Sequence, residues 1–138
     1  MVDSDARPAR HWLMSFQECV RAQDFVRART MFAANVIGFG TRADIAVGLD
    51  ALERDQWRQV WPRIRDFAFQ VDALHCFGGD RGLCIMVPWA SLGVGGDGST
   101  FPRAGRATIM LAPPGSAWVA VHTHFSLEPD RSQGSSLP

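Results

Sequence analysis

The segment His122-Thr123-His124 holds the side chains of this sequence best suited to metal chemistry. Two imidazoles two positions apart on a strand lie on one face, and both could bind zinc. A zinc site needs a third ligand, and no HxxE or CxxC motif lies near this segment. We therefore expect a hydrogen-bonded histidine pair at a structural position or an interface. The sequence predicts no metal ion and no other cofactor.

Acid–base catalysis would need a carboxylate whose pKa is raised by an apolar pocket. Asp44 and Asp72 are the candidates for this role, although carboxylates of this kind are more often solvated surface groups. The chain contains no Tyr, which removes phenol-based chemistry. It also shows no Ser, His and Asp arrangement around a nucleophile elbow. The catalytic residues, if there are any, stay unknown at this point.

The glycine-rich run Gly93–Gly98 resembles a phosphate-binding loop only superficially. It lacks the GxGxxG spacing, and the pattern after it predicts a strand, not a helix whose amides could bind phosphate. A hairpin loop is the better interpretation.

The three cysteines are Cys19, Cys76 and Cys84. An odd number without CxxC spacing argues against a disulfide framework and against a thiolate zinc site. Cys76 and Cys84 flank a predicted turn at 78–82 and could face each other across a hairpin, so their pairing stays open. We expect buried thiols in a reducing compartment. The first residues also lack the apolar core of a signal peptide, and a cytoplasmic location is expected.

The composition is that of a globular protein. The 138 residues fit one domain, and 46% of them are hydrophobic while 20% are charged. Fourteen basic residues balance fourteen acidic ones, so no basic field predicts binding to nucleic acid. No apolar run is long enough to cross a bilayer, and no membrane partner is expected.

Helical patterns occupy the first half of the chain. Apolar residues at three- and four-residue spacing predict a helix near 9–22. Asp24 is a candidate N-cap for a second helix, which would place Phe25, Ala28, Met31 and Phe32 on one stripe. The region 35–48 is predicted to be a loop with one or two short strands. A third helix is expected from Leu49 to Ile64, with Pro62 ending or kinking it.

Strand patterns occupy the second half. Period-2 alternation predicts strands at 67–77, 82–92, 103–112 and 117–127, joined by turns into an antiparallel meander. Pro88 cannot donate a ladder hydrogen bond and should mark an edge or a bulge. Helices followed by such a sheet predict an α+β fold with three N-terminal helices on one face of four long, strongly curved strands. The domain should span 10–127, with disordered tails at 1–9 and 128–138.

Alternation also assigns the two faces of the closing strand. The face expected to meet the helices carries Val119, Val121, Thr123, Phe125 and Leu127. The other face carries Trp118, Ala120, His122, His124 and Ser126, next to Arg106, Thr108 and Met110 of the preceding strand. This second surface is too apolar for a fully solvated sheet face and too polar for the core of a monomer. It therefore predicts a sheet-to-sheet homodimer. Its interface would contain Arg106, Thr108, Trp118, His122 and His124.

Three segments resemble the nuclear transport factor 2-like superfamily. They are Val47-Gly48-Leu49-Asp50, Val60-Trp61 and the closing Trp118–Ser126 stretch. Within the superfamily the chain is most similar to the SnoaL-like group and to the association domain of calcium/calmodulin-dependent protein kinase II, over about residues 10–127. The resemblance implies a cone with a pocket between the helices and the concave sheet face. The pocket would be lined by Phe39, Trp61, Trp89, Ile109, Thr123 and Phe125.

The resemblance indicates the fold more strongly than it indicates any activity. The kinase association domain resembles an anion binder through strand arginines, but those positions align with Trp89, Ile109 and Phe125 here. Ketosteroid isomerases use a pocket Tyr, which this chain lacks. We therefore predict a homodimer that binds a small hydrophobic molecule. The alternatives are an isomerase, dehydratase or polyketide cyclase-type enzyme acting on an apolar carbonyl substrate, and a non-catalytic oligomerisation scaffold.

Overall fold

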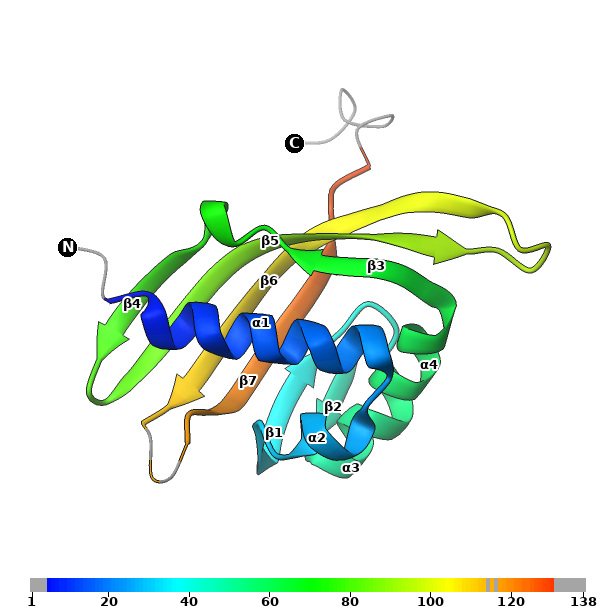
Figure 1. Ribbon diagram of the computed structural model, residues 1–138. Helices are drawn as coiled ribbons and strands as arrows, with labels where there is room; N and C mark the ends of the chain where they lie inside the picture. The colour runs from blue at the N-terminus through cyan, green and yellow to red at the C-terminus, as the bar shows by residue number, and fades with distance from the viewer. Residues whose placement is uncertain (1–4, 114, 116, 131–138) are drawn as a thin grey trace.

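A computed structural model describes residues 5–113, 115 and 117–130. The helical elements are α1 (Arg7–Ala22), α2 (Phe25–Arg29) and a composite segment built from α3 (Leu49–Leu52), the π-helix η1 (Glu53–Trp57), α4 (Arg58–Val60) and the 3-10 turn η2 (Trp61–Arg63). The strands are β1 (Phe32–Phe39), β2 (Ile45–Val47), β3 (Ile64–Phe69), β4 (His75–Gly79), β5 (Gly82–Val94), β6 (Thr100–Ala112) and β7 (Val119–Leu127), with a 3-10 turn η3 (Val71–Ala73) before β4. Figure 1 shows the long helix α1 lying across the sheet.

The helix α1 forms where the apolar spacing predicts it. α2 begins as predicted but ends at Arg29, so Met31 and Phe32 of the predicted stripe lie beyond it, and Phe32 begins β1. The buried stripe of α1 contains Trp12, Phe16 and Val20, and the helix ends at Gln23, whose φ of 53° is left-handed. The Asp24 side chain accepts a hydrogen bond from the backbone N–H of Arg27, as expected for an N-cap. α1 begins at Arg7, and Ala9 is fully buried, so the predicted N-terminal tail is partly helical. Residues 1–4 and 131–138 of the predicted tails lie outside the described residues.

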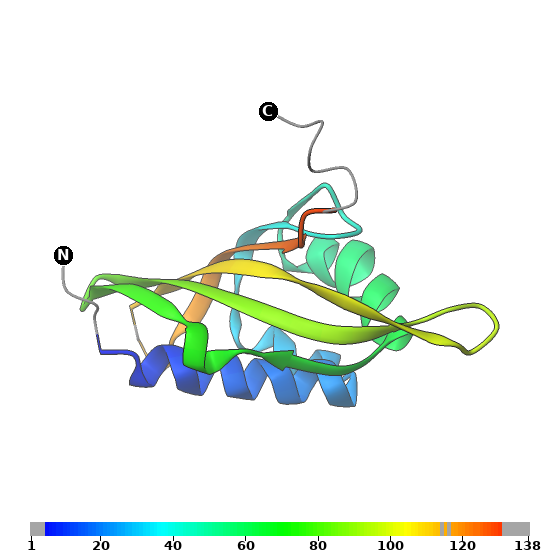
Figure 2. The same cartoon turned by 90° about the horizontal axis from the view of Figure 1, so that it is seen from above.

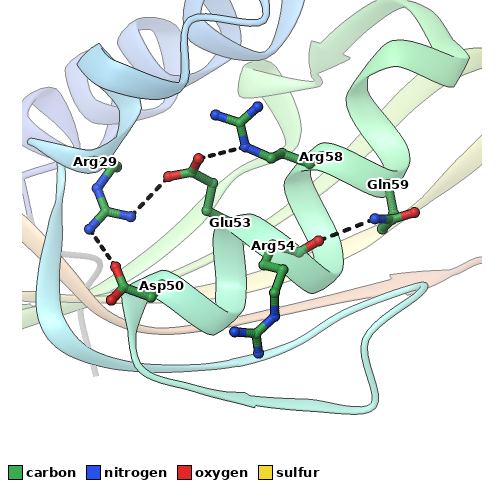
Figure 3. Close-up of polar contacts among 6 residues, drawn as sticks. All are labelled: Arg29, Asp50, Glu53, Arg54, Arg58 and Gln59. Carbon is green, nitrogen blue, oxygen red and sulfur yellow. Dashed lines mark hydrogen bonds and ion pairs between the residues drawn. The ribbon is translucent and has the colours of Figure 1, made fainter.

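An ion-pair network joins α2 to the composite third helix. Arg29 contacts Asp50 at 2.7 Å and Glu53 at 2.9 Å, and Glu53 also contacts Arg58 at 2.7 Å (Figure 3). The Arg58 guanidinium lies 4.3 Å from the centre of the Phe25 ring on α2. Burial acts to raise the pKa of Glu53, but its hydrogen bonds to Arg29 and Arg58 outweigh this and lower that pKa.

The strands form one sheet in the order β2-β1-β7-β6-β5-β3, with β4 also pairing with β5. β1 and β7 run parallel, while the other pairs are antiparallel. The short strands predicted within 35–48 are present as β2 and the second half of β1, but β1 begins earlier than predicted, at Phe32, and runs to Phe39. Small residues weakened the strand pattern there. Gly38 is needed because a Cβ at this position would lie 2.7 Å from the Leu52 side chain.

The predicted continuous strand at 67–77 is also wrong. β3 pairs with β5 up to Phe69 opposite Trp89, and β4 begins with His75 opposite Met86, with η3 between them. Pro88 lies at this break, and its missing N–H leaves nothing to donate to a continuing partner strand. A register shift between Arg65 and Ala68, with Asp66 at a left-handed φ of 57°, bends β3 just before it.

The inner face of the sheet is the one covered by α1 and the composite third helix, and the outer face is its opposite. Side chains of β5 alternate strictly, with Leu83, Ile85, Val87 and Trp89 buried on the inner face. β7 does not alternate strictly, because its register shifts between Met110 and Leu111 of β6. Ala120 and Thr123 are therefore both buried, while Val121 between them is exposed. The predicted faces of Ala120 and Val121 are wrong for this reason.

The hairpin of β5 and β6 extends beyond the helical layer (Figure 2). Its Gly93 has no room for a side chain, because the Phe101 ring lies where a Cβ would be. Cys76 pairs with Ile85, and Cys84 pairs with Phe77, so the two thiols lie on opposite faces of the β4–β5 hairpin. They are therefore not placed to face each other. In the described part of the chain, no helix has both the length and the apolar character to cross a membrane.

Candidate functional site

A small cavity lies between α1, the composite third helix and the inner face of the sheet. Its volume is about 40 Å³, counting only positions open to the centre of a water-sized sphere. About 10–15 Å³ of such space holds one water, so the cavity has room for a short apolar group. Most of its lining is apolar and comes from distant parts of the chain. The lining residues are Phe16, Val20, Phe32, Phe39, Gly40, Thr41, Leu52, Gln56, Trp57, Val60, Trp61, Ile64, Phe67, Trp89, Arg103, Thr123 and Phe125.

Aromatic rings form the apolar wall of the cavity. The rings of Trp57 and Trp61 stack at 4.9 Å, and Phe25 stacks on Trp61 at 5.0 Å. Phe16 of α1 lies 5.7 Å from Trp61 and 6.5 Å from Phe125. These contacts fix the wall through several elements at once, so the cavity is bounded by rings with little freedom to move.

One end of the cavity is polar and is organised by Gln56. Its Oε1 accepts hydrogen bonds from the backbone N–H groups of Arg42 and Ala43 at 2.8 Å, and its Nε2 donates to Thr41 Oγ1 at 2.9 Å. Gln56 lies in the π-helix η1, a geometry that often occurs at functional sites. Gly40 lies between Phe39 and Thr41. It has no room for a side chain, because a Cβ there would overlap the Gln56 amide.

Arg103 supplies the positive charge of this polar end. One of its terminal nitrogens donates to Thr41 Oγ1 at 2.8 Å, and its guanidinium carbon lies 5.3 Å from the centre of the Trp89 ring. The side chain is half-buried, and this desolvation lowers its pKa from the ordinary value. Sequence reasoning missed Arg103. Continuing the alternation of the inward residues Ala107 and Ile109 back along β6 would have placed it on the inner face.

Trp89 forms part of the floor of the cavity and is 1% exposed. Its Nε1 is buried, and no acceptor within the described part of the chain lies within hydrogen-bonding distance of it. The indole fits over β6 because Gly105 has no side chain: a Cβ there would lie 2.6 Å from Trp89 Cζ2 and would overlap the Ser126 carbonyl.

The predicted pocket residues fall into three groups. Trp61, Trp89, Thr123 and Phe125 line the cavity. Ile109 is fully buried and lies outside the lining. Phe39 borders the cavity, but it pairs with His124 and its ring contacts the two imidazoles on the outer face.

The candidate carboxylates do not reach the cavity. Asp44 is exposed in the turn between β1 and β2. Asp72 lies in η3, and its fully exposed side chain has Arg10 3.9 Å away. Among the described residues that line the cavity, none is Asp, Glu or His.

His122 and His124 lie on the outer face, on either side of the Phe39 ring. The ring centres are 4.9 Å and 5.3 Å from that of Phe39, and both contacts are edge-to-face. His122 Nδ1 donates to the Ile37 carbonyl oxygen at 2.6 Å. Across residues 5–113, 115 and 117–130, no group of three His, Cys, Asp or Glu side chains is placed to hold a metal ion.

Of the other three residues predicted at the interface, two lie on the outer face and one does not. Arg106 and Thr108 lie on the outer face of β6, opposite Ser126 and His124. Trp118 does not lie with them, because it precedes β7 and packs against the core, bordering a surface depression with Trp12 and Met31. The predicted alternation fails at Trp118 because the residue stands before the regular strand begins.

No protein-family model matches the chain, and no curated protein matches it. Solved structures do match. A Xanthomonas campestris protein classed as a calcium/calmodulin-dependent protein kinase II association domain superposes with a TM-score of 0.78 at 11% identity, over 93% of this chain and 91% of the other. A Streptomyces avermitilis protein classed as a dehydratase of the nuclear transport factor 2-like family gives a TM-score of 0.78 at 13% identity, over 91% of this chain and 98% of the other. A ketosteroid isomerase-like protein from Erwinia carotovora gives 0.74 at 12%, over 94% and 100%.

The chain has the nuclear transport factor 2-like fold. The predicted α+β class and the resemblance in architecture are confirmed by these superpositions. Identities this low carry the fold and not the chemistry, because the same fold supports many unrelated sites. In this nuclear transport factor 2-like chain, function must therefore be argued from the cavity and the outer face.

Proposed function

We propose that this protein binds a small, mainly apolar molecule in the cavity and does so as a homodimer. The observation that carries the first part is an aromatic-walled cavity with a few polar groups gathered at one end. Thr41, Gln56 and Arg103 can orient a ligand there. The dimensions favour a short chain over a ring system, since engineered cavities that accept benzene are about 150 Å³.

Binding is favoured over catalysis by the composition of the lining. An isomerase, dehydratase or cyclase acting beside a carbonyl needs a positioned base, which is most often His, Asp or Glu. The described lining offers none, and its one ionisable group is the Arg103 guanidinium, which does not lose its proton near neutral pH. The enzyme alternative would therefore need a base from outside the described lining.

The homodimer is supported by the outer face of the sheet. Met110 and Ile37 are 45% and 41% exposed there, and outward side chains along β5, such as Met86 and Leu92, are only half-buried. Exposed apolar side chains gathered on one sheet face commonly mark an interaction surface. The oligomerisation scaffold differs from this proposal only in having no ligand, so a binding experiment separates the two.

The five tryptophans provide a direct test of binding. Trp57, Trp61 and Trp89 line the cavity, whereas Trp12 and Trp118 do not. Titration with 1-butanol should shift the indole ¹⁵N–¹H resonances of the first three and leave the other two unchanged. The variant Val60→Phe should abolish these shifts by filling the cavity margin, while Val26→Phe, at an 81% exposed position of α2, should keep them. Shifts at no cavity tryptophan would contradict the proposal.

A further inference from the structure

The outer face of the sheet brings sulfur atoms together from two strands. Cys84 and Met86 lie two residues apart on β5, and both are half-buried on this face. Met110 of β6 pairs directly with Cys84 and is 45% exposed. Cys19 and Cys76 are buried, so Cys84 is the cysteine that an ion at the surface can reach. Cys84, Met86 and Met110 are called the sulfur cluster below.

The strand register places the side chains of the sulfur cluster within reach of one another. Residues directly opposite on antiparallel strands have Cβ atoms about 4.5–5.5 Å apart, and Cys84 and Met110 are such a pair. Met86 lies two residues along β5, about 7 Å from Cys84, and is the diagonal neighbour of Met110. Methionine has a flexible, unbranched side chain, so both thioethers can turn towards the Cys84 sulfur while the backbone stays in place. One ion can therefore contact all three sulfur atoms.

Imidazoles flank the sulfur cluster on both sides. His75 of β4 pairs with Met86, and His122 of β7 pairs with Met110. Because His122 Nδ1 donates to the Ile37 carbonyl oxygen, the lone pair of this ring lies on Nε2. Histidines that bind metals commonly donate their other ring N–H to a backbone carbonyl in this way. The outer face therefore has nitrogen donors at the margin of its sulfur donors.

The donor atoms of the sulfur cluster suit a soft monovalent ion. Thiolate and thioether ligands select Cu(I), whereas zinc sites use Cys, His and carboxylate ligands. A thiol binds a metal as its thiolate, so the Cys84 proton passes to water when the ion binds. One Cu⁺ with one thiolate and two thioethers forms a neutral complex. Such a complex leaves no unpaired charge on an apolar sheet face.

We propose that the outer face binds one Cu(I) ion per chain through Cys84 Sγ, Met86 Sδ and Met110 Sδ. The ion binds and leaves as Cu(I), so no electron is transferred. All three ligands belong to one chain, and the site therefore does not require the homodimer. Where two chains meet through this face, the ion lies between the two sheets. The three residues form no sequence motif, because only the pairing of β5 with β6 brings Met110 to the other two.

Anaerobic titration with Cu(I), in competition with a chromophoric Cu(I) chelator, measures the affinity and the stoichiometry. One ion should bind per chain, and Zn²⁺ should bind at least about ten-fold more weakly. Cu(I) is diamagnetic, so the methionine ε-methyl ¹³C–¹H resonances can be followed during the titration. The resonances of Met86 and Met110 should shift, because their sulfurs bind the ion. Those of Met14 on α1 and Met31, which packs against the core, should not shift.

Methionine-to-leucine substitutions remove a thioether at nearly constant volume. Met86→Leu and Met110→Leu should each weaken Cu(I) binding at least about ten-fold, because each removes one of the three ligands. Met14→Leu is the matched control, since Met14 is 40% exposed on α1, and it should change the affinity less than about two-fold. Cys84→Ser should abolish binding. Urea unfolding shows that each variant is folded.

Four outcomes would overturn the site. Absence of Cu(I) binding is the first. If Cys84→Ser abolishes binding while both outer-face leucine variants bind as the unsubstituted protein does, the thiol binds the ion without the thioethers. If Zn²⁺ binds as tightly as Cu(I), the ligands are imidazole and thiolate. If Met14→Leu weakens binding as strongly as Met110→Leu does, the ion binds elsewhere.

The Cu(I) site and the proposed function fail separately. Titration with 1-butanol and the indole resonances report on the cavity, which lies on the inner face. Met110→Leu keeps the outer face apolar, so it should remove a Cu(I) ligand and leave the homodimer intact in sedimentation experiments. Loss of the dimer in this variant would show that the thioether contributes to the contact between chains.

Discussion

Gln56 connects the helical layer to the turn that closes the polar end of the cavity. Its amide serves two backbone N–H groups and the Thr41 hydroxyl, and Thr41 in turn accepts from Arg103. The Gln56 amide therefore holds the Thr41 hydroxyl, and this hydroxyl positions the Arg103 guanidinium. A single side chain sets both the shape of the turn and the direction of the charge.

Replacing Gln56 with Leu should destabilise the fold by about 2–3 kcal/mol, because the N–H groups of Arg42 and Ala43 lose their acceptor. Urea unfolding at neutral pH measures this loss. Gln59→Leu is the matched control, since the Gln59 amide makes only a long 3.3 Å contact to the Arg54 carbonyl, and we expect it to cost less than about 0.5 kcal/mol. Equal effects of the two substitutions would show that the turn does not depend on Gln56.

At the residue level, the sequence predicted part of the cavity. Trp61, Trp89, Thr123 and Phe125, which the family resemblance placed in the pocket, line the cavity. Alternation along β6 places Arg103 on the inner face but does not show its contact with Thr41, and no local pattern shows that Gln56 supports a turn that is distant in sequence. Ile109 was assigned to the right face, but neighbouring side chains cover it completely.

At the level of elements, α2 and the composite third helix are held together by charge as well as by stacking. Glu53 is the centre of this contact, with its side chain 14% exposed between Arg29 and Arg58. Asp50 contacts the same Arg29 but is 88% exposed, and water screens that pair. The two carboxylates therefore allow a buried contact and an exposed one to be compared with the same partner.

Glu53→Gln should lower the free energy of unfolding by about 1–2 kcal/mol near neutral pH. The folded-state pKa of Glu53 lies below its ordinary value of 4.5, so its stabilising contribution is present above that value and is lost as the pH falls through the folded pKa. The difference from the unsubstituted protein should therefore shrink as the pH falls below 4.5 in urea unfolding curves. Asp50→Asn should cost about 0.5 kcal/mol or less. A difference that stays constant with pH would contradict this account.

The errors in the predicted elements have local causes. The sequence alternates throughout 67–77, but Pro88 in the neighbouring strand has no N–H to donate to a continuous partner strand, so the pairing is interrupted there. The start of β1 was missed because Ala33, Ala34 and Gly38 give little strand signal, and the parallel pairing with β7 that stabilises it is a long-range contact. Periodicity describes one segment at a time, whereas both of these features depend on a contact between two segments.

For the whole molecule, the proposed homodimer depends on the outer face of the sheet. Met110 is 45% exposed at the centre of that face, beside His122 on β7. A charged group at this position would be buried without a partner in a sheet-to-sheet dimer. It would cost little on a free surface.

Met110→Glu should therefore convert the dimer to a monomer in sedimentation experiments and leave the chain folded. Val26→Glu, at a position 81% exposed on α2, should leave the dimer unchanged. A monomer in both the unsubstituted protein and the variants would contradict the dimer and leave only the cavity to carry the function.

The overall architecture was predictable because it depends on summed patterns: helical spacing in the first half, alternation in the second and a closing segment that resembles the fold family. The cavity was less predictable because it depends on small differences in packing. Gly38, Gly40 and Gly105 each leave space that a neighbouring side chain fills, and only the folded contacts show which neighbour that is.

The parallel pairing of β1 with β7 has a consequence for how the protein is made. These strands are separated by most of the chain, and the hydrogen bond from His122 to Ile37 spans 85 positions. While the chain emerges from a ribosome, β1 must wait with one edge unsatisfied until β7 has been synthesised. Contacts this distant slow folding and expose strand edges to other nascent chains. The unpaired edge of β1 therefore stays open to other nascent chains until β7, the last strand, has been synthesised.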